Sequence, residues 1–138
     1  MGSMLDTRAL FAVEGFLRSL GSSPKRKDVT VAGARHPAFQ VDSETVVVHP
    51  KAGASYTRKT RRYEHGLRKS VLEPYAAADY LVAIYEDDTG SVLIASARDL
   101  VAAARESSMD SYEGHVVTLF FPRDGMTLAV DGKKGAAQ

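Results

Sequence analysis

The stretch YLVAIYEDDTGSVLIA, residues 80–95, decides how this chain folds. Two apolar runs, residues 80–85 and 91–95, flank the polar segment EDDTG at residues 86–90. β-Branched and aromatic residues favour strands, and a short polar segment with glycine is typical of the turn between two antiparallel strands. The sequence therefore predicts a β-hairpin over these residues.

Before this hairpin, the sequence predicts one helix and several short strands. Apolar residues recur every three or four positions over residues 5–20, which is typical of an amphipathic helix. Residues 28–32 form a short β-rich stretch. Residues 38–41 and 44–49 are predicted strands joined at Asp42-Ser43, and Pro50 is expected to end the second because proline lacks a backbone N–H. Residues 67–78 fit no single element, because Pro74 would break or delay a helix there.

After the central hairpin, residues 99–106 are predicted to form a short helix capped near Ser96. Residues 116–121 and 126–130 flank the turn segment PRDG and predict a second hairpin. The expected fold class is α+β. We expect an amino-terminal helix, then a mixed or antiparallel sheet with two hairpins, and one or two further helices.

The composition is typical of one globular domain. The chain has 138 residues, 44% of them hydrophobic and 25% charged, with a formal net charge of +1. We expect the domain to span residues 4–131 and the tail, 132–138, to fray; residues 1–3, ahead of Met4, resemble the remnant of an expression vector. With no cysteine, the chain has neither disulfides nor a thiolate zinc site. Its apolar runs fall short of the ~20 residues of a membrane span, so a cytoplasmic protein without a membrane partner is expected.

Positive charge is concentrated between Lys51 and Lys69, where seven basic residues accompany a single acid, Glu64. Such a stretch predicts an anionic partner, and the planar guanidinium of arginine suits phosphate while tyrosine can stack on bases. We therefore expect nucleic acid as the partner, DNA more than RNA. The predicted contact residues are Arg58, Lys59, Arg61, Arg62, Tyr63, Arg68 and Lys69.

Three acidic or basic positions carry a resemblance to a known family. A helix containing Glu14, a strand ending near Asp42 and a following strand that ends in His49-Pro50-Lys51 resemble a degenerate PD-(D/E)XK (restriction-endonuclease-like) nuclease core. Residues 78–84 and 90–94 are similar to the paired strands that follow the catalytic motif in some of these proteins. The resemblance covers roughly residues 5–105.

For such a nuclease, the resemblance implies a Mg²⁺ ion held by Asp42, with Lys51 orienting the water and Glu14 as the helix glutamate of some members. His49 stands where the family has its second acid, and imidazole is a poorer Mg²⁺ ligand than carboxylate. Both a Mg²⁺-dependent phosphodiesterase and an inactive, binding-only derivative remain open, and no other cofactor is expected.

Two other classes of function also remain open. One is an accessory or inhibitor protein of a phage or mobile element, which would act through a protein partner. The other is a homodimeric or small-molecule-binding domain, with Tyr80, Tyr85, Phe120 and Phe121 lining an interface or pocket. The four histidines lack the spacing of a helical zinc site.

Overall fold

The computed structural model describes residues 4–51, 55–57, 62–106, 115–122, 129–130 and 133–134. Its helices are α1 (Met4–Ser19), α2 (Lys69–Ala77) and α3 (Ala97–Ala102). The strands of the amino-terminal part are β1 (Lys25–Arg26), β2 (Val29–Val31), β3 (Ala34–His36), β4 (Ala38–Val41), β5 (Glu44–Lys51) and β6 (Ser55–Thr57). Those of the remainder are β7 (Arg62–Arg68), β8 (Leu81–Glu86), β9 (Ser91–Ser96), β10 (Arg105–Glu106), β11 (His115–Pro122), β12 (Ala129–Val130) and β13 (Lys133–Lys134).

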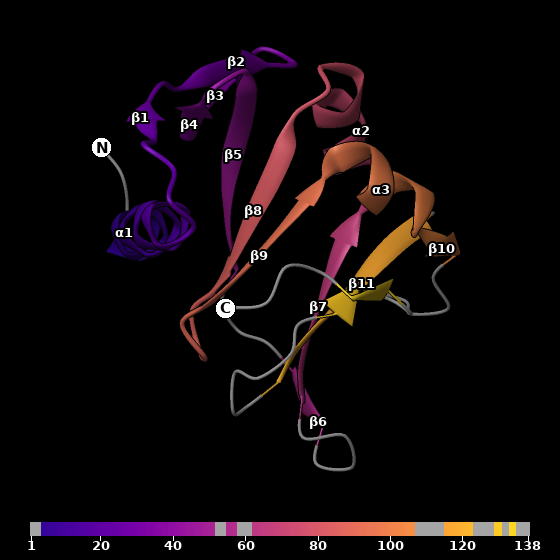
Figure 1. Cartoon of the computed structure of the whole chain (residues 1–138). Coiled ribbons are helices and arrows are strands. Elements are labelled where there is room, and N and C mark those ends of the chain that lie inside the picture. Colours follow the sequence, from indigo (N-terminus) through magenta and orange to yellow (C-terminus); the bar gives the residue numbers. More distant parts are fainter. Residues whose placement is uncertain are drawn as a thin grey trace.

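A mixed five-stranded sheet, in the order β1-β4-β5-β8-β9, forms the centre of the molecule (Figure 1). Neighbouring strands are antiparallel except for β5 and β8, which run parallel. In that parallel pair Val47 lies beside Val82, and Lys51 lies beside Glu86 at the carboxyl ends of both strands. Two strands that are 30 residues or more apart in the sequence therefore present their last residues side by side.

A second sheet has the order β13-β12-β11-β7-β6, with β10 also paired to β11. Its main contact is the antiparallel pair β7 and β11, in which His65 lies beside Leu119 and Leu67 beside Val117. Strands β2 and β3 form a separate two-stranded hairpin. The α+β class and the amino-terminal helix predicted from the sequence are confirmed.

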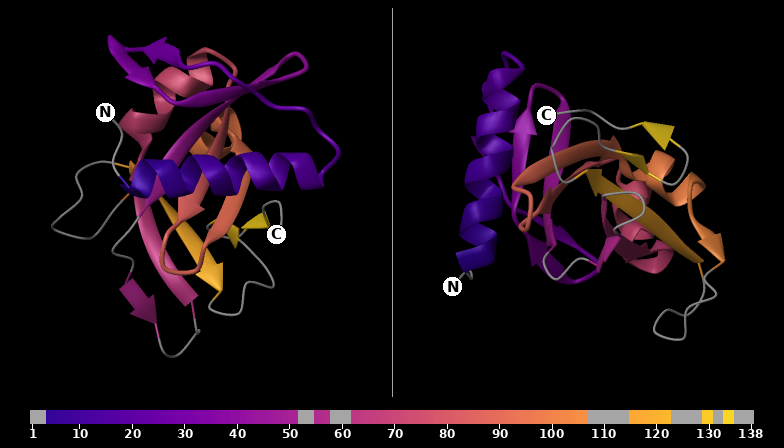
Figure 2. Two further views of the ribbon diagram at one scale, coloured as in Figure 1. Left: turned by 90° about the vertical axis from the view of Figure 1, so that its left-hand side faces the viewer. Right: turned by 90° about the horizontal axis from the view of Figure 1, so that it is seen from below.

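The five-stranded sheet is covered on both faces. Helix α1 lies across one face, where Ala9, Val13, Phe16 and Leu17 pack against alternate residues of β5, β8 and β9 (Figure 2). The opposite face packs against α2, α3, β7 and β11, and the core there includes Val47, Val82, Ile84, Leu93, Leu67, Val117 and Leu119. Because side chains alternate along a strand, each strand contributes to both cores.

The first predicted hairpin is confirmed, since β8 and β9 pair antiparallel from Leu81 beside Ser96 to Glu86 beside Ser91. Strands β11 and β12 also pair antiparallel, but residues 123–128, which hold most of the predicted second turn, lie outside the described residues. The expected helix cap is also confirmed, since the Ser96 hydroxyl accepts a hydrogen bond of 3.0 Å from the Asp99 backbone N–H. Helix α3 ends at Ala102, earlier than predicted, because residues 105–106 form a strand beside β11.

The expectation that Pro50 ends its strand is wrong, since β5 continues to Lys51. The Val48 N–H points toward the β4 side, where it donates to the Pro37 carbonyl at 2.9 Å. Backbone groups two residues apart in a strand point the same way, so the missing N–H of Pro50 would face that same side, beyond the start of β4. Pairing with β8 does not need it, and the Lys51 carbonyl accepts a bond from the Asp87 N–H at 2.9 Å.

Residues 67–78, which fit no single element in the sequence, divide between a strand and a helix. Strand β7 ends at Arg68 and α2 begins at the next residue, with Pro74 inside the helix. Leu72 and Tyr75 of α2 are buried against the core, so tertiary packing holds this nine-residue helix despite its proline.

Candidate functional site

Polar side chains continue a buried apolar stripe where the parallel strands end. On β5, the stripe that includes Val47 continues through His49 and Lys51; on β8, the stripe of Val82 and Ile84 continues to Glu86. These polar residues face β7 of the second sheet, which presents His65 in line with the buried Leu67. We call the set formed by His49, Lys51, His65 and Glu86 the inter-sheet site.

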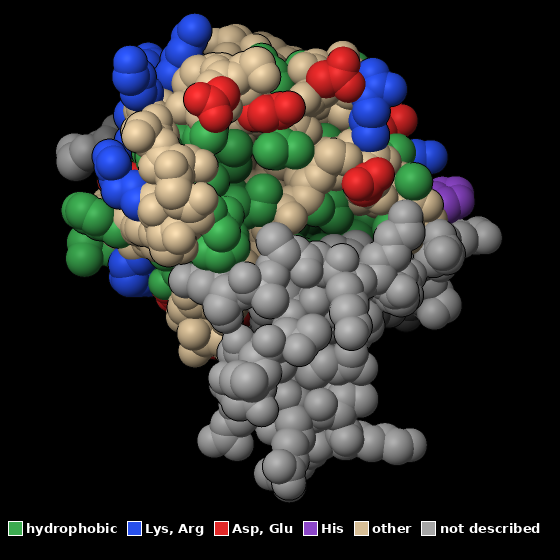
Figure 3. Space-filling model, in the orientation of Figure 1, with side chains coloured by type: hydrophobic (Ala, Val, Ile, Leu, Met, Phe, Trp, Pro, Cys, Tyr) green, Lys and Arg blue, Asp and Glu red, His purple; other side chains and the backbone are tan. Residues whose placement is uncertain are grey.

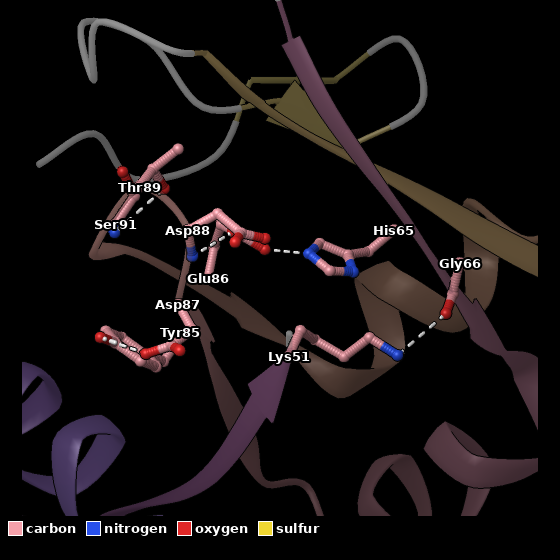
Figure 4. A network of polar contacts seen from close by, with 9 residues as sticks. All are labelled: Lys51, His65, Gly66, Tyr85, Glu86, Asp87, Asp88, Thr89 and Ser91. Atoms are coloured by element: carbon pink, nitrogen blue, oxygen red, sulfur yellow. Dashed lines mark hydrogen bonds and ion pairs between the residues drawn. The ribbon is translucent and has the colours of Figure 1, made fainter. Parts of the chain in front are cut away.

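Glu86 is fully buried, with 0% of its surface exposed. Its Oε2 atom contacts Nε2 of His65 in a short hydrogen bond, and its Oε1 atom accepts a hydrogen bond of 2.6 Å from the Asp88 backbone N–H (Figure 4). His65 is only 7% exposed. A carboxyl group from one sheet and an imidazole from the other are thus locked together inside the protein.

Burial shifts the pKa values of this pair in opposite directions. It raises the pKa of the Glu86 carboxyl to about 7 and lowers that of His65 to about 4, because it disfavours the charged form of each group. Lys51 lowers the pKa of His65 further. Below about pH 7 the Glu86 carboxyl therefore tends to hold a proton, while the His65 imidazole stays neutral down to about pH 4.

The polar turn after β8 places neighbouring carboxylates on opposite sides of the sheet. Asp87 faces α1, where its two carboxylate oxygens accept hydrogen bonds of 2.8 and 2.9 Å from the Arg8 guanidinium. The Tyr85 hydroxyl donates to the same carboxylate at 3.0 Å. The Arg8 contact lowers the pKa of Asp87, so this residue stays ionised while its neighbour Glu86 is held neutral.

Lys51 is half-buried beside the Glu86–His65 pair (Figure 4). Its Nζ atom donates a long hydrogen bond of 3.4 Å to the Gly66 carbonyl of β7. Burial lowers the pKa of this ammonium group, and the nearby Glu86 partly opposes that shift. Within the part of the chain that the structure describes, no carboxylate lies within ion-pair distance of Lys51.

His49 is the fourth member of the site and is also half-buried. Burial lowers its pKa to about 4, and the charges of Lys51 and His36 add to this effect. The Tyr75 hydroxyl forms a hydrogen bond of 3.2 Å with Nδ1 of His36. The two rings meet edge to face, with their centroids 5.3 Å apart. No hydrogen bond joins the His49 ring to another residue among those described.

The residues predicted to form a nuclease site do not meet. Asp42 lies in the turn between β4 and β5 with a φ of +52°, whereas Lys51 lies at the opposite end of β5. The seven steps from Glu44 to Lys51 span about 23 Å at the usual strand rise. Glu14 lies on α1, which covers the other face of the sheet, and forms an ion pair with Arg18 at 3.0 Å.

A magnesium ion held by Asp42 does not fit this arrangement. Lys51 is too far from Asp42 to share one phosphate or one water with it, because strand β5 separates them. Among the described residues, no three histidine, aspartate or glutamate side chains are grouped so that they could hold a metal ion. The resemblance to the nuclease core therefore has no assembled catalytic centre in the described residues.

The basic stretch begins at Lys51 and contains the antiparallel pair β6 and β7, in which Tyr56 lies beside Tyr63 and Thr57 beside Arg62. Figure 1 shows this pair extending away from the five-stranded sheet. Arg68 is exposed at the end of β7, and Lys69 begins α2. The predicted contacts Arg58, Lys59 and Arg61 lie outside the described residues. We call residues 55–69 the basic hairpin, since Lys51 belongs to the inter-sheet site.

The sequence did not single out His65 and Glu86 as functional residues, and it gave His49 no role beyond its place in the family motif. The sequence pattern assigned Glu86 to a turn. His65 was one of four histidines scattered along the chain. One signal was available, because Glu86 follows Val82 and Ile84 at a spacing of two, as an inward-facing residue does. The pairing of β5 with β8, which brings Lys51 beside it, has no such signal.

Comparisons with known proteins found no significant similarity. The chain matches no protein-family model, and neither curated proteins nor solved structures yield a significant match. Among the described residues, no helix has both the length and the apolar character needed to cross a membrane.

Proposed function

We propose that this protein binds nucleic acid through the basic hairpin. The observation that carries the proposal is the charge of this segment, which holds six lysines and arginines and a single acid in residues 55–69. A cationic stretch with interleaved tyrosines matches the backbone and the bases of a nucleic acid strand. DNA is the first ligand to test, and RNA the second.

Several arginines outside this segment are already paired with acids. Arg8, Arg18, Arg26, Arg35 and Arg98 each form an ion pair with an aspartate or glutamate. A guanidinium already matched to a carboxylate contributes little to the attraction of a polyanion. On the face drawn in Figure 3, the described residues present both basic and acidic side chains.

The proposed function does not include cleavage by the Asp42 and Lys51 pair, because these residues lie at opposite ends of β5. A binding-only protein accounts for the charge without a catalytic metal. The basic hairpin can hold a phosphate backbone whether or not the protein performs chemistry elsewhere.

The test is a salt titration of oligonucleotide binding. Each phosphate that a basic side chain neutralises adds about −0.9 to the slope of log K against log salt on duplex DNA, so engagement of all six basic residues gives a slope of about −5. The variant Arg58→Glu/Lys59→Glu is expected to abolish binding. Its matched control is Lys25→Glu/Lys27→Glu, an equal charge change at two exposed lysines, which should leave most of the affinity.

Equal losses of affinity in both variants would refute a specific role for the basic hairpin, because they would point to net charge alone. Undetectable binding of both DNA and RNA at low salt would refute the proposed function. That result would favour a protein partner, and the exposed Met4 and Phe11 of α1, at 74% and 72% exposure, are the first residues to examine for it.

A further inference from the structure

The inter-sheet site has unused capacity to bind an anion. Lys51 carries three N–H donors, and its contact with the Gly66 carbonyl is long at 3.4 Å. The His49 ring has no hydrogen-bond partner among the described residues, and both side chains are half-buried rather than enclosed. No fully buried side-chain nitrogen or oxygen lacks a partner in the described part, so the unpaired polar atoms of this site are in contact with solvent.

The carboxyl group of Glu86 does not take up the free N–H donors of Lys51. Glu86 directs one oxygen at His65 and the other at the Asp88 N–H, both away from Lys51 (Figure 4). Burial favours the protonated form of Glu86, so its charge offsets that of Lys51 only in part. No described carboxylate forms an ion pair with Lys51.

We propose that the inter-sheet site binds a single phosphate group, held by the Lys51 ammonium group and by a ring N–H of His49. An oxyanion placed beside Lys51 supplies the partner that the described carboxylates do not. It also favours a proton on His49, since a nearby negative charge stabilises the imidazolium. The His65–Glu86 pair lies beside the site, and the raised pKa of Glu86 reduces its repulsion of the anion.

The position of the site indicates where this phosphate comes from. Lys51 is the last residue of β5 in the first sheet, and His65 lies in β7 of the second sheet, so the inter-sheet site lies at the base of the basic hairpin. A strand of nucleic acid held by the hairpin would thus bring a phosphate to this point. The inference rests on the proposed function for the source of the phosphate, but the site itself can be tested with inorganic phosphate.

The experiment follows the imidazole NMR signals of the full-length protein during a titration with inorganic phosphate at constant ionic strength. We expect a saturable shift of the His49 signal at roughly millimolar phosphate, as for a small ligand held by a few charge-assisted hydrogen bonds. The exposed His115 is the internal control and should shift weakly and without saturation.

Lys51→Met keeps the length of the side chain but removes its charge, and it should weaken phosphate binding by about tenfold or more. Lys51→Arg should retain most of the binding. Lys27→Met, the same change at an exposed lysine, is the matched control and should have no effect. Circular dichroism checks that each variant is folded; if Lys51→Met is not, His49→Gln replaces it with the same expected loss.

A comparison of 5′-phosphorylated and 5′-hydroxyl oligonucleotides distinguishes a terminal phosphate from one within the strand. Tighter binding of the phosphorylated form, abolished in Lys51→Met, identifies the terminal group, whereas an equal effect on both identifies the backbone. The inference is wrong if phosphate leaves the His49 signal unmoved, or if it binds Lys51→Met as well as the wild type. Oligonucleotide binding without phosphate binding overturns this inference alone, and the reverse result overturns only the proposed function.

Discussion

The buried pair of His65 and Glu86 predicts that single substitutions will expose a hidden pH dependence of stability. In the unfolded chain, the ordinary pKa values are 4.5 for Glu86 and 6.5 for His65, so one proton resides on the histidine at about pH 5.5. In the folded protein the pKa of Glu86 is about 7 and that of His65 about 4, so the one proton resides on the glutamate. Folding moves the proton but hardly changes the number bound.

Stability varies with pH only where the folded and unfolded states bind different numbers of protons. The wild-type pair should therefore contribute almost no pH dependence between pH 4.5 and 6.5, where both states hold one proton. Each partner alone would contribute strongly, since each pKa is far from its unfolded value. The two contributions have opposite signs and cancel.

Glu86→Gln leaves His65 with a lowered folded pKa. Stability that is fully present above pH 6.5 should then be lost as the pH falls toward 4, by up to about 3 kcal/mol across that interval. His65→Gln leaves Glu86 with a raised folded pKa. Stability that is fully present below pH 4.5 should then be lost as the pH rises through 7, again by up to about 3 kcal/mol.

Urea unfolding at half-unit intervals from about pH 4.5 to 8 measures these effects. The quantity to plot is the free energy of unfolding of each variant minus that of the wild type, because contributions from other titrating groups then cancel. We expect slopes of opposite sign for the two single variants and a nearly flat line for His65→Gln/Glu86→Gln. If the free energy of unfolding of both single variants changed with pH just as that of the wild type does, the proton exchange between the partners would be refuted.

Three further predictions concern single positions. His49→Gln should make the loss of wild-type stability between pH 6.5 and 4 shallower in urea unfolding, because the folded pKa of His49 lies at about 4; an unchanged acid limb would contradict this. Leu72→Ala should lower the free energy of unfolding by about 2–5 kcal/mol, since Leu72 is 1% exposed, whereas Val71→Ala at 41% exposure should change it by less than about 0.5 kcal/mol; equal effects would place Leu72 outside the core. Ala32→Asn should stabilise the turn between β2 and β3 by a few tenths to about 1 kcal/mol, measured as a rise in Tm, because Ala32 and the following glycine have φ values of +51° and +79° and Asn-Gly suits such a turn; a lower Tm would contradict that geometry.

The sequence predicts those parts of the fold whose signals are local. The apolar alternation around Ile84 and Leu93 identifies β8 and β9, and the Ser96 hydroxyl caps α3 as expected. Strand β7 was not predicted, because its sequence RYEHGLR shows only one aliphatic residue, Leu67, on its buried face. Its pairing with β11 joins residues about 50 positions apart, and such pairings leave no periodic signal in either segment.

Only part of the candidate site was predicted, for a related reason. Lys51 was chosen for its place in a short motif, and it does lie in a polar cluster, but with Glu86 and His65 instead of Asp42. The family resemblance implied that Asp42 and Lys51 share one site, yet an extended strand separates them. Parallel pairing determines which side chains meet, and the crossover from β5 to β8 passes through all of β6, β7 and α2.

The polar members of the inter-sheet site are not explained by packing. Positions 65 and 86 continue stripes that otherwise hold Leu67, Val82 and Ile84, and an apolar side chain there would extend the core without removing charge from water. Burying ionisable groups costs several kcal/mol per ion, and even a well-made buried pair is often no more stabilising than apolar residues of similar size. A pair that holds one neutralising proton avoids most of this cost, but it leaves Lys51 without a described carboxylate partner. An apolar pair at these positions would make the fold no less stable, so selection for stability alone does not account for His65 and Glu86.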